Sequence, residues 1–182
     1  LNLAGATVLE LGCGKAQLTR AISEQFAVKK IIATEVDTLQ HTANLASDYP
    51  TNIEFRSGGA QAIDLPDNSV DVVFMFKSLH HVPVELMPQA FQEIARVLKP
   101  QGSVWISEPI YAGAFNEVLR LFHDEQRVRS AAFQQTQQVV DTGLLQLKQQ
   151  IFFNAETRFA DFGEFEQRII GVTHTKHVLS TE

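Results

Sequence analysis

Short hydrophobic runs alternate with amphipathic stretches over the first two thirds of the chain. Apolar runs of this length, bounded by polar or turn residues, are typical of buried strands. We therefore expect strands over residues 7–11, 30–35, 53–56, 70–76 and 103–107. Apolar positions that recur at the helical period predict helices over residues 17–27, 39–49 and 85–98.

This alternation predicts an α/β fold: a doubly wound, mostly parallel, Rossmann-like sheet with helices on both faces. The helix over residues 85–98 is followed by Pro100 and Gly102, which we expect to stop it and to turn the chain into the fifth strand. Ligands of such sheets bind beyond the carboxyl ends of the strands. The residues at these ends are Gly12, Glu35, Gly58, Phe76 and Glu108.

The last third of the chain has a different pattern. Residues 114–145 are helical in character and rich in glutamine, with Phe133, Val139 and Val140 interleaved, so we expect a helical cover after the fifth strand. A further strand is expected over residues 146–154, followed by a short helix over 161–170 that Asp161 caps. We expect the phenylalanines of this part to belong to the core: Phe152, Phe153, Phe159, Phe162 and Phe165.

Composition narrows the class of protein. The 182 residues are 45% hydrophobic and 20% charged, as in an ordinary globular domain, and no linker divides them. A net charge of -6 and a pI near 5.5 disfavour nucleic acid as a partner and leave a small molecule or a protein as the substrate. A single cysteine and the lack of a membrane-spanning run predict a soluble, cytoplasmic protein with no membrane contact.

The start of the chain suggests that it is part of a longer protein. It does not begin with Met, and the first predicted strand starts after only a few residues. We therefore expect helices that precede this strand, and any targeting signal, to lie outside the sequence.

The sequence VLELGCGKA over residues 8–16 places a glycine turn directly between a buried strand and a helix. Glycines there permit unusual backbone angles, and the free N–H groups of the helix start attract an anionic group. Glu35, at the end of the second strand, is placed to accept hydrogen bonds from ribose hydroxyls. Together these features predict a nucleotide-type site.

Two residues argue against a dinucleotide. Gln17 occupies the position of the third glycine in the pattern G-x-G-x-x-G. A carboxylate such as Glu10 about 5 Å from a pyrophosphate charge would cost about 3 kcal/mol per charge pair at an effective dielectric near 20. A ligand with a sulfonium and an ammonium group would not be repelled, so a nicotinamide-dependent oxidoreductase is the weaker alternative.

The chain resembles the class I S-adenosylmethionine-dependent methyltransferases, particularly their small-molecule branch. The resemblance covers residues 6–109 and rests on VLELGCGKA (8–16), Glu35, GGAQAIDLPDNSVDVV (58–73), SLHHV (78–82) and RVLKPQGSVWISEP (96–109). It implies S-adenosyl-L-methionine as the cofactor and transfer of its methyl group to a small-molecule acceptor. It also implies a single methyltransferase domain over 1–182, with a cofactor-binding core (1–110), a helical cover (111–145) and a C-terminal strand and helix (146–182) that stops before the family's final antiparallel strand.

The same resemblance assigns residues to the cofactor. Gly12, Gly14, Phe76 and Lys77 should border its methionine part, Glu35 should hold the ribose, and Ala60 and Gln61 should lie beside the adenine. Glu10, Cys13, Val36 and Gly59 complete the expected set. The chain departs from the family at Ala16, where a third glycine is usual, and at Gly59, where an aspartate usually binds the adenine amino group.

Chemistry on the acceptor side is less defined by the sequence. His80 and His81 follow the fourth strand, near the transferred methyl group, and either is a candidate general base or simply a satisfied polar residue. Glu108 and Tyr111, after the fifth strand, are candidate substrate contacts. The histidines and acids show no metal-ligand spacing such as H-E-x-x-H, so no metal is expected. A methyltransferase-like binding protein without catalysis remains the alternative from another class.

Overall fold

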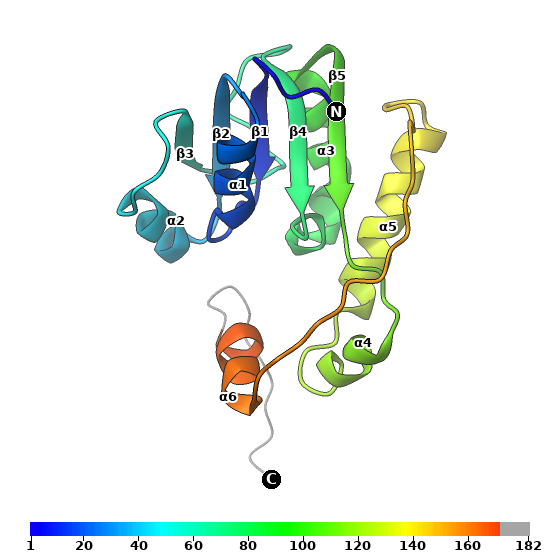
Figure 1. Ribbon diagram of the computed structural model, residues 1–182. Helices are drawn as coiled ribbons and strands as arrows, with labels where there is room; N and C mark the ends of the chain where they lie inside the picture. The colour runs from blue at the N-terminus through cyan, green and yellow to red at the C-terminus, as the bar shows by residue number, and fades with distance from the viewer. Residues whose placement is uncertain (172–182) are drawn as a thin grey trace.

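The computed structural model describes residues 1–171, and its centre is a five-stranded sheet in the order β3-β2-β1-β4-β5 (Figure 1). All neighbouring strands run parallel, which confirms the predicted fold class. The strands are β1 (Thr7–Leu11), β2 (Lys30–Glu35), β3 (Ile53–Ser57), β4 (Val70–Phe76) and β5 (Leu98–Ser107). The order reverses between β1 and β4, so the carboxyl ends of these two strands flank the place where such sheets bind ligands.

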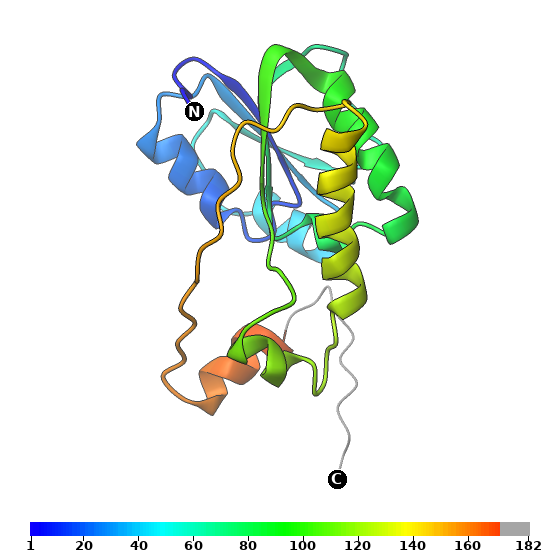
Figure 2. The same ribbon diagram turned by 90° about the vertical axis from the view of Figure 1, so that its right-hand side faces the viewer.

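Helices cover both faces of the sheet, as Figure 2 shows with α1 on one side and α3 and α5 on the other. Ile22 of α1 (Gln17–Gln25) joins a buried cluster with Val8 and Ile31, whereas Phe91 of α3 (Met87–Val97) joins a second cluster with alternate strand residues. α2 (Thr38–Leu45) packs on β2 and β3, and α5 (Gln126–Asp141) packs on α3. Because successive side chains of a strand point to opposite faces of the sheet, the strands contribute residues to two separate cores.

The prediction of a separate turn between α3 and the fifth strand is wrong. α3 ends at Val97, but β5 already begins at Leu98, and the predicted turn residues lie inside the strand as a bulge. The register passes from Val70 opposite Leu98 to Val72 opposite Ser103, and Gln101 has a φ of 72°. Proline has no N–H for a ladder, so within a strand it is accommodated at such an irregularity.

The cover consists of α4 (Ala114–Leu119) and α5, in agreement with the prediction of helices after the fifth strand. Near the end of the described chain, α6 (Phe162–Phe165) continues as a wider turn over Glu166–Ile170. The Asp161 side chain accepts a hydrogen bond from the Glu164 N–H at 2.8 Å, which confirms the expected cap. Within the described residues no helix is long and apolar enough to cross a membrane.

The expected strand over residues 146–154 does not form. The segment after α5 runs past the sheet as an extended chain without a ladder partner, and Leu147 is 56% exposed (Figures 1 and 2). A strand depends on a neighbour for its backbone hydrogen bonds, so a local apolar run does not suffice to make one. The core prediction is likewise wrong for Phe152, Phe153 and Phe162, which are exposed, whereas Phe159 and Phe165 pack on each other with ring centroids 5.2 Å apart.

Candidate functional site

The loop after β1 depends on left-handed backbone angles. Gly12 has a φ of 73° and Gly14 a φ of 52°, and Ala16 adopts 53° at the start of α1. A Cβ at position 12 would lie 2.6 Å from the Cβ of Ser78, whose hydroxyl donates to the Leu11 carbonyl at 2.7 Å. A side chain at Gly12 is therefore excluded by the loop after β4 as well as by the backbone angle.

Glu35 joins the loops that follow β1 and β2. One carboxylate oxygen accepts the Gly14 N–H at 2.7 Å, and the other accepts the N–H groups of Val36 and Asp37 at 2.8 and 3.0 Å. The side chain is buried. A carboxylate has about four acceptor sites, so three are used by the backbone and room remains for a ligand hydroxyl. Glu35 thus has a structural role that its position in the sequence did not reveal.

Asn44 is a functional-site residue that the sequence did not indicate, because an asparagine in a helix usually faces solvent. It is buried, and its amide donates to the Gly14 carbonyl at 2.8 Å, close to the Cys13 sulfur. Burial, together with the charges of Glu10 and Glu35, raises the pKa of the Cys13 thiol to about 12. The thiol is therefore protonated and unreactive, and Cys13 serves as a small packing residue of the loop.

Glu10 is a buried carboxylate at the base of the same loop. It is 2% exposed, and the Thr19 hydroxyl donates to it at 2.5 Å. Burial raises its pKa to about 7, with the hydrogen bond from Thr19 acting in the opposite direction. It lines a cavity of about 130 Å³ together with three other expected cofactor residues, Gly12, Cys13 and Phe76. Lys15 of the same loop also lines this cavity. A buried carboxylate in this place attracts a cationic group and disfavours an anionic one.

Phe76 and Lys77 lie differently at the end of β4. Phe76 stacks on Phe74 with ring centroids 5.0 Å apart and faces the cavity beside Glu10. Lys77 has a left-handed φ of 55°, donates its backbone N–H to the Ser107 carbonyl at 2.8 Å, and exposes its side chain. The structure therefore brings Phe76, and only the backbone of Lys77, to this end of the site.

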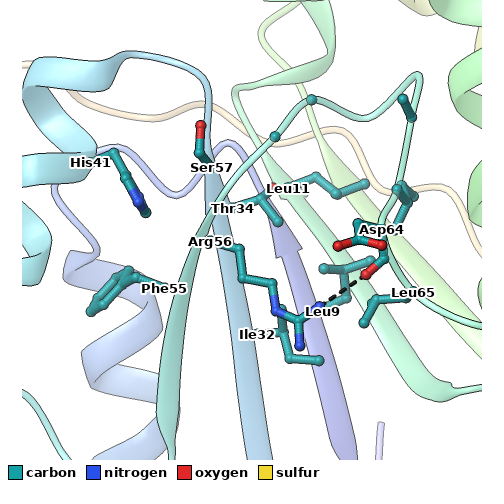
Figure 3. Close-up of a pocket in the computed structure, with 14 residues that line it drawn as sticks. Leu9, Leu11, Ile32, Thr34, His41, Phe55, Arg56, Ser57, Asp64 and Leu65 are labelled. Carbon is teal, nitrogen blue, oxygen red and sulfur yellow. Dashed lines mark hydrogen bonds between the residues drawn. The ribbon is translucent and has the colours of Figure 1, made fainter.

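A second cavity of about 290 Å³ lies at the ends of β2 and β3 (Figure 3). Leu9, Leu11 and Ile32 give it an apolar floor, while Arg56 donates to the Asp64 carbonyl at 2.9 Å across its mouth. His41 lines it, and its buried Nδ1 has no hydrogen-bond partner among the described residues. A cavity with an apolar floor, polar walls and one buried nitrogen without a partner suits a flat heterocycle with polar edges.

Of the expected cofactor residues, Gly59, Ala60 and Gln61 lie near this cavity, whereas Val36 does not. Gly59 lines the second cavity and Ala60 is buried next to it, whereas Val36 is 64% exposed outside it. A Cβ on Gly59 would lie 2.5 Å from the Gln61 Oε1 atom. The Gln61 amide therefore occupies the space that a side chain at position 59 would take.

At the ends of β4 and β5 the candidate acceptor-side residues contact one another. His80 is buried, its Nδ1 lies 2.5 Å from Glu108 Oε2, and the other Glu108 oxygen accepts the Leu79 N–H at 2.8 Å. Glu108 thus holds the short helix η1 (Leu79–His81) through both of its carboxylate oxygens. His81 is exposed, with its ring centroid 4.1 Å from that of His80, and Tyr111 lies half-buried in the connection to α4.

Two cover residues that the sequence did not indicate complete this end. Glu125, at the start of α5, is buried with an oxygen 3.7 Å from His80 Nε2, and Arg129 donates to its other oxygen. Burial acts to raise the pKa of Glu125, but the charges of Arg129, His80 and His123 and the hydrogen bond from Arg129 together outweigh it, so the pKa lies below its usual value. Arg129 also donates to Asn116 at 2.9 Å, which links α5 with α4.

Comparison with known proteins gives consistent relatives. A family described as a methyltransferase domain matches residues 8–102. An uncharacterized methyltransferase of Schizosaccharomyces pombe is 41% identical over 100 residues, which are 54% of this chain and 37% of that protein. The ubiquinone/menaquinone biosynthesis C-methyltransferase of Hahella chejuensis is 34% identical over 110 residues, 58% of this chain and 43% of that protein.

The solved structure of a putative sarcosine dimethylglycine methyltransferase from Galdieria sulphuraria is 30% identical with a TM-score of 0.54, covering 59% of this chain and 40% of that one. The chain thus spans about two fifths of the length of these proteins. Because the family match takes in β1 to β4 with the glycine loop and covers over half of the 182 residues, the chain belongs to the class I S-adenosylmethionine-dependent methyltransferase family.

Proposed function

We propose that the chain binds S-adenosyl-L-methionine across the two cavities and forms the cofactor-binding part of an enzyme that methylates a small-molecule acceptor. The observation that carries this proposal is the buried carboxylate of Glu10 beneath the glycine loop. A buried acid at this point suits the ammonium and sulfonium of this cofactor, and it opposes the pyrophosphate of a dinucleotide.

The residues present fit each part of the cofactor. Glu10 would hold the ammonium group, and the backbone around Gly12 and Gly14 would border the methionine part. The free acceptor site of Glu35 would take a ribose hydroxyl. The second cavity, with its apolar floor and with Gln61 and the unsatisfied Nδ1 of His41 near it, would take the adenine.

The acceptor would approach from the ends of β4 and β5. The bound cofactor supplies an activated methyl group whose departure leaves a neutral thioether, so the protein has mainly to align the acceptor and exclude water. We propose that His81, which is exposed, takes the acceptor proton where one must leave, while His80 and Glu108 position it and Tyr111 borders the acceptor. The net charge of -6 and the quinone C-methyltransferase among the relatives support a small, non-anionic acceptor.

Calorimetric titration with S-adenosylmethionine and with NAD⁺ tests the cofactor. We expect S-adenosylmethionine to bind and Glu35→Ala to weaken it by about 1.5 to 3 kcal/mol, roughly 12- to 160-fold. The exposed Glu24, which pairs with Arg20 on α1, supplies the control Glu24→Ala, whose affinity should equal that of the wild type. Binding of NAD⁺ in preference to S-adenosylmethionine, or an unchanged affinity in Glu35→Ala, would overturn the assignment.

Transfer of a labelled methyl group to a panel of small quinol, phenol and amine acceptors separates an enzyme from a binding protein. With a methylated acceptor in hand, His81→Ala should lower turnover more than it lowers cofactor affinity. Cofactor binding without transfer to any acceptor would favour the catalytically inactive alternative.

A further inference from the structure

Three side chains that can bind a metal meet at the junction of the core and the cover. His80 and His81 come from η1, and Glu125 comes from the start of α5. One potential ligand atom from each residue lies within 4.8 Å of the other two. The positions of these three residues in the sequence match no common metal-ligand motif, so it is the fold that brings their side chains together.

The orientation of His80 is fixed by a carboxylate. An ionised Glu108 can only accept, so its contact with Nδ1 at 2.5 Å places the ring proton on that nitrogen. Nε2 then carries a lone pair, and the Oε1 atom of Glu125 lies 3.7 Å from it. This distance is too long for a hydrogen bond. Two ligands that are each about 2.0 to 2.2 Å from a tetrahedral ion lie roughly 3.4 Å apart, so an ion fits between these two atoms.

The charges at the junction call for a cation. Glu108 and Glu125 carry two negative charges in a buried setting, and Arg129 supplies one positive charge to the far oxygen of Glu125. His123 contacts the near oxygen of Glu125 at 3.1 Å. One negative charge is left over when the histidines are neutral, and a buried charge without a partner is costly. A cation bound between the histidines and Glu125 would offset it.

We propose that His80, His81 and Glu125 form a binding site for a divalent transition-metal ion, of which Zn²⁺ is the representative probe. Two imidazoles and one carboxylate are ligands that zinc and its neighbours accept, whereas Mg²⁺ and Ca²⁺ prefer oxygen alone. Glu108 behind His80 and Arg129 behind Glu125 provide the outer hydrogen bonds that orient metal ligands. The ion would fasten α5 to the end of β4.

This inference goes beyond the proposed methyl transfer, because metal binding is measured without cofactor or acceptor. The role of His81 as a proton acceptor belongs to the metal-free chain, whereas in the metal-bound chain both histidines act as ligands. The ion would also leave a coordination position open, since three protein ligands do not complete a tetrahedral shell.

The test is a calorimetric titration of the chelator-stripped chain with Zn²⁺, repeated with Co²⁺ and its visible absorption. We expect one ion to bind per chain, and His81→Ala and Glu125→Gln each to weaken binding about 10- to 100-fold. The matched control for Glu125→Gln is Glu24→Gln, which changes an exposed carboxylate on α1 and should bind Zn²⁺ as tightly as the wild type.

Absence of saturable binding by the wild type would overturn the proposal. Equal affinity in wild type and His81→Ala, or loss of binding in the control, would also overturn it. If Glu125→Gln fails to fold, the exposed His81 decides the question, since its replacement leaves the core intact. Loss of S-adenosylmethionine binding alone would count against the proposed function and not against this site.

Discussion

The two ends of the sheet's carboxyl edge hold their charges in different ways. At the end of β1 and β2, Glu35 is bound by three backbone N–H groups. At the end of β4 and β5, His80, Glu108 and Glu125 are bound largely by one another and by Arg129. The first arrangement depends on backbone angles within a short loop, whereas the second depends on a helix from the distant cover.

This difference has consequences for robustness. At the end of β1 and β2, an added Cβ should lower the unfolding free energy, because the loops there approach each other closely. At the end of β4 and β5, removal of one charge should lower the unfolding free energy, because the remaining charges are buried together. The variants below test each end by the change to which it should be most sensitive.

The largest effect is expected from Arg129→Met. The variant leaves Glu125 buried without the guanidinium that contacts one of its oxygens, and removing one partner of a buried pair costs about 3 to 5 kcal/mol of unfolding free energy. Urea denaturation measures the loss. Arg120→Met is the control, since its exposed pair with Glu117 on α4 should contribute less than about 1 kcal/mol. Equal stabilities of the two variants would show that the buried network is not needed.

At the other end, Gly12→Ala should lower the unfolding free energy by about 2 to 4 kcal/mol, through the strained backbone angle and the contact with Ser78. Gly14→Ala is the matched control. Its φ is also left-handed, but a Cβ there meets nothing within 4 Å, so only about 1 kcal/mol of strain is expected. Thermal unfolding of both variants separates contact from strain, and similar losses would contradict the close approach of the loops.

Glu10→Gln should stabilise the folded chain at high pH. The folded pKa of Glu10 is raised to about 7, so the folded state holds this proton more tightly, and the wild type loses stability as pH rises from the unfolded value through 7. The variant lacks this loss. Its advantage in unfolding free energy should grow from near zero at pH 4 to about 3 kcal/mol at pH 8, while its affinity for S-adenosylmethionine falls.

Glu54→Gln provides the control of opposite sign. Hydrogen bonds from Lys30 and Arg56 lower the pKa of Glu54, so its stabilisation is present above the unfolded pKa and is lost in acid. This variant should therefore be no more stable than the wild type at pH 8. If the difference in unfolding free energy between Glu10→Gln and the wild type did not depend on pH, the pKa of Glu10 would not be raised by burial.

The smallest effect is expected from Gly59→Asp. The backbone of Gly59 is not left-handed, so aspartate fits without strain, but its Cβ must displace the Gln61 amide. In the wild-type background, the contacts that Gln61 loses and the contact that the aspartate gains should nearly cancel in the affinity for S-adenosylmethionine. In a Gln61→Ala background, Gly59→Asp should tighten S-adenosylmethionine binding by about 0.5 to 1.5 kcal/mol. Calorimetry that shows no gain in that background would place the adenine elsewhere.

Much of the fold was determined by the sequence alone. β1, β2 and β4 have the predicted bounds, since each buried strand is a short apolar run that ends at a glycine or a polar residue. The glycine loop was equally predictable, because left-handed angles at Gly12 and Gly14 leave few other residue types. Asp161 could be recognised as a cap from local chemistry. All of these features involve residues that are close together in the chain.

What only the tertiary structure decided involves partners that lie far apart. The extended segment after α5 has apolar residues but no neighbouring strand, so it did not become one. Gln61 fills the space above Gly59, and Glu35 is held by backbone groups of two loops. His80 meets Glu108 and Glu125 because β4, β5 and α5 converge at one edge. Local sequence fixes which backbone angles are allowed, whereas the packing of distant segments fixes which charges face each other.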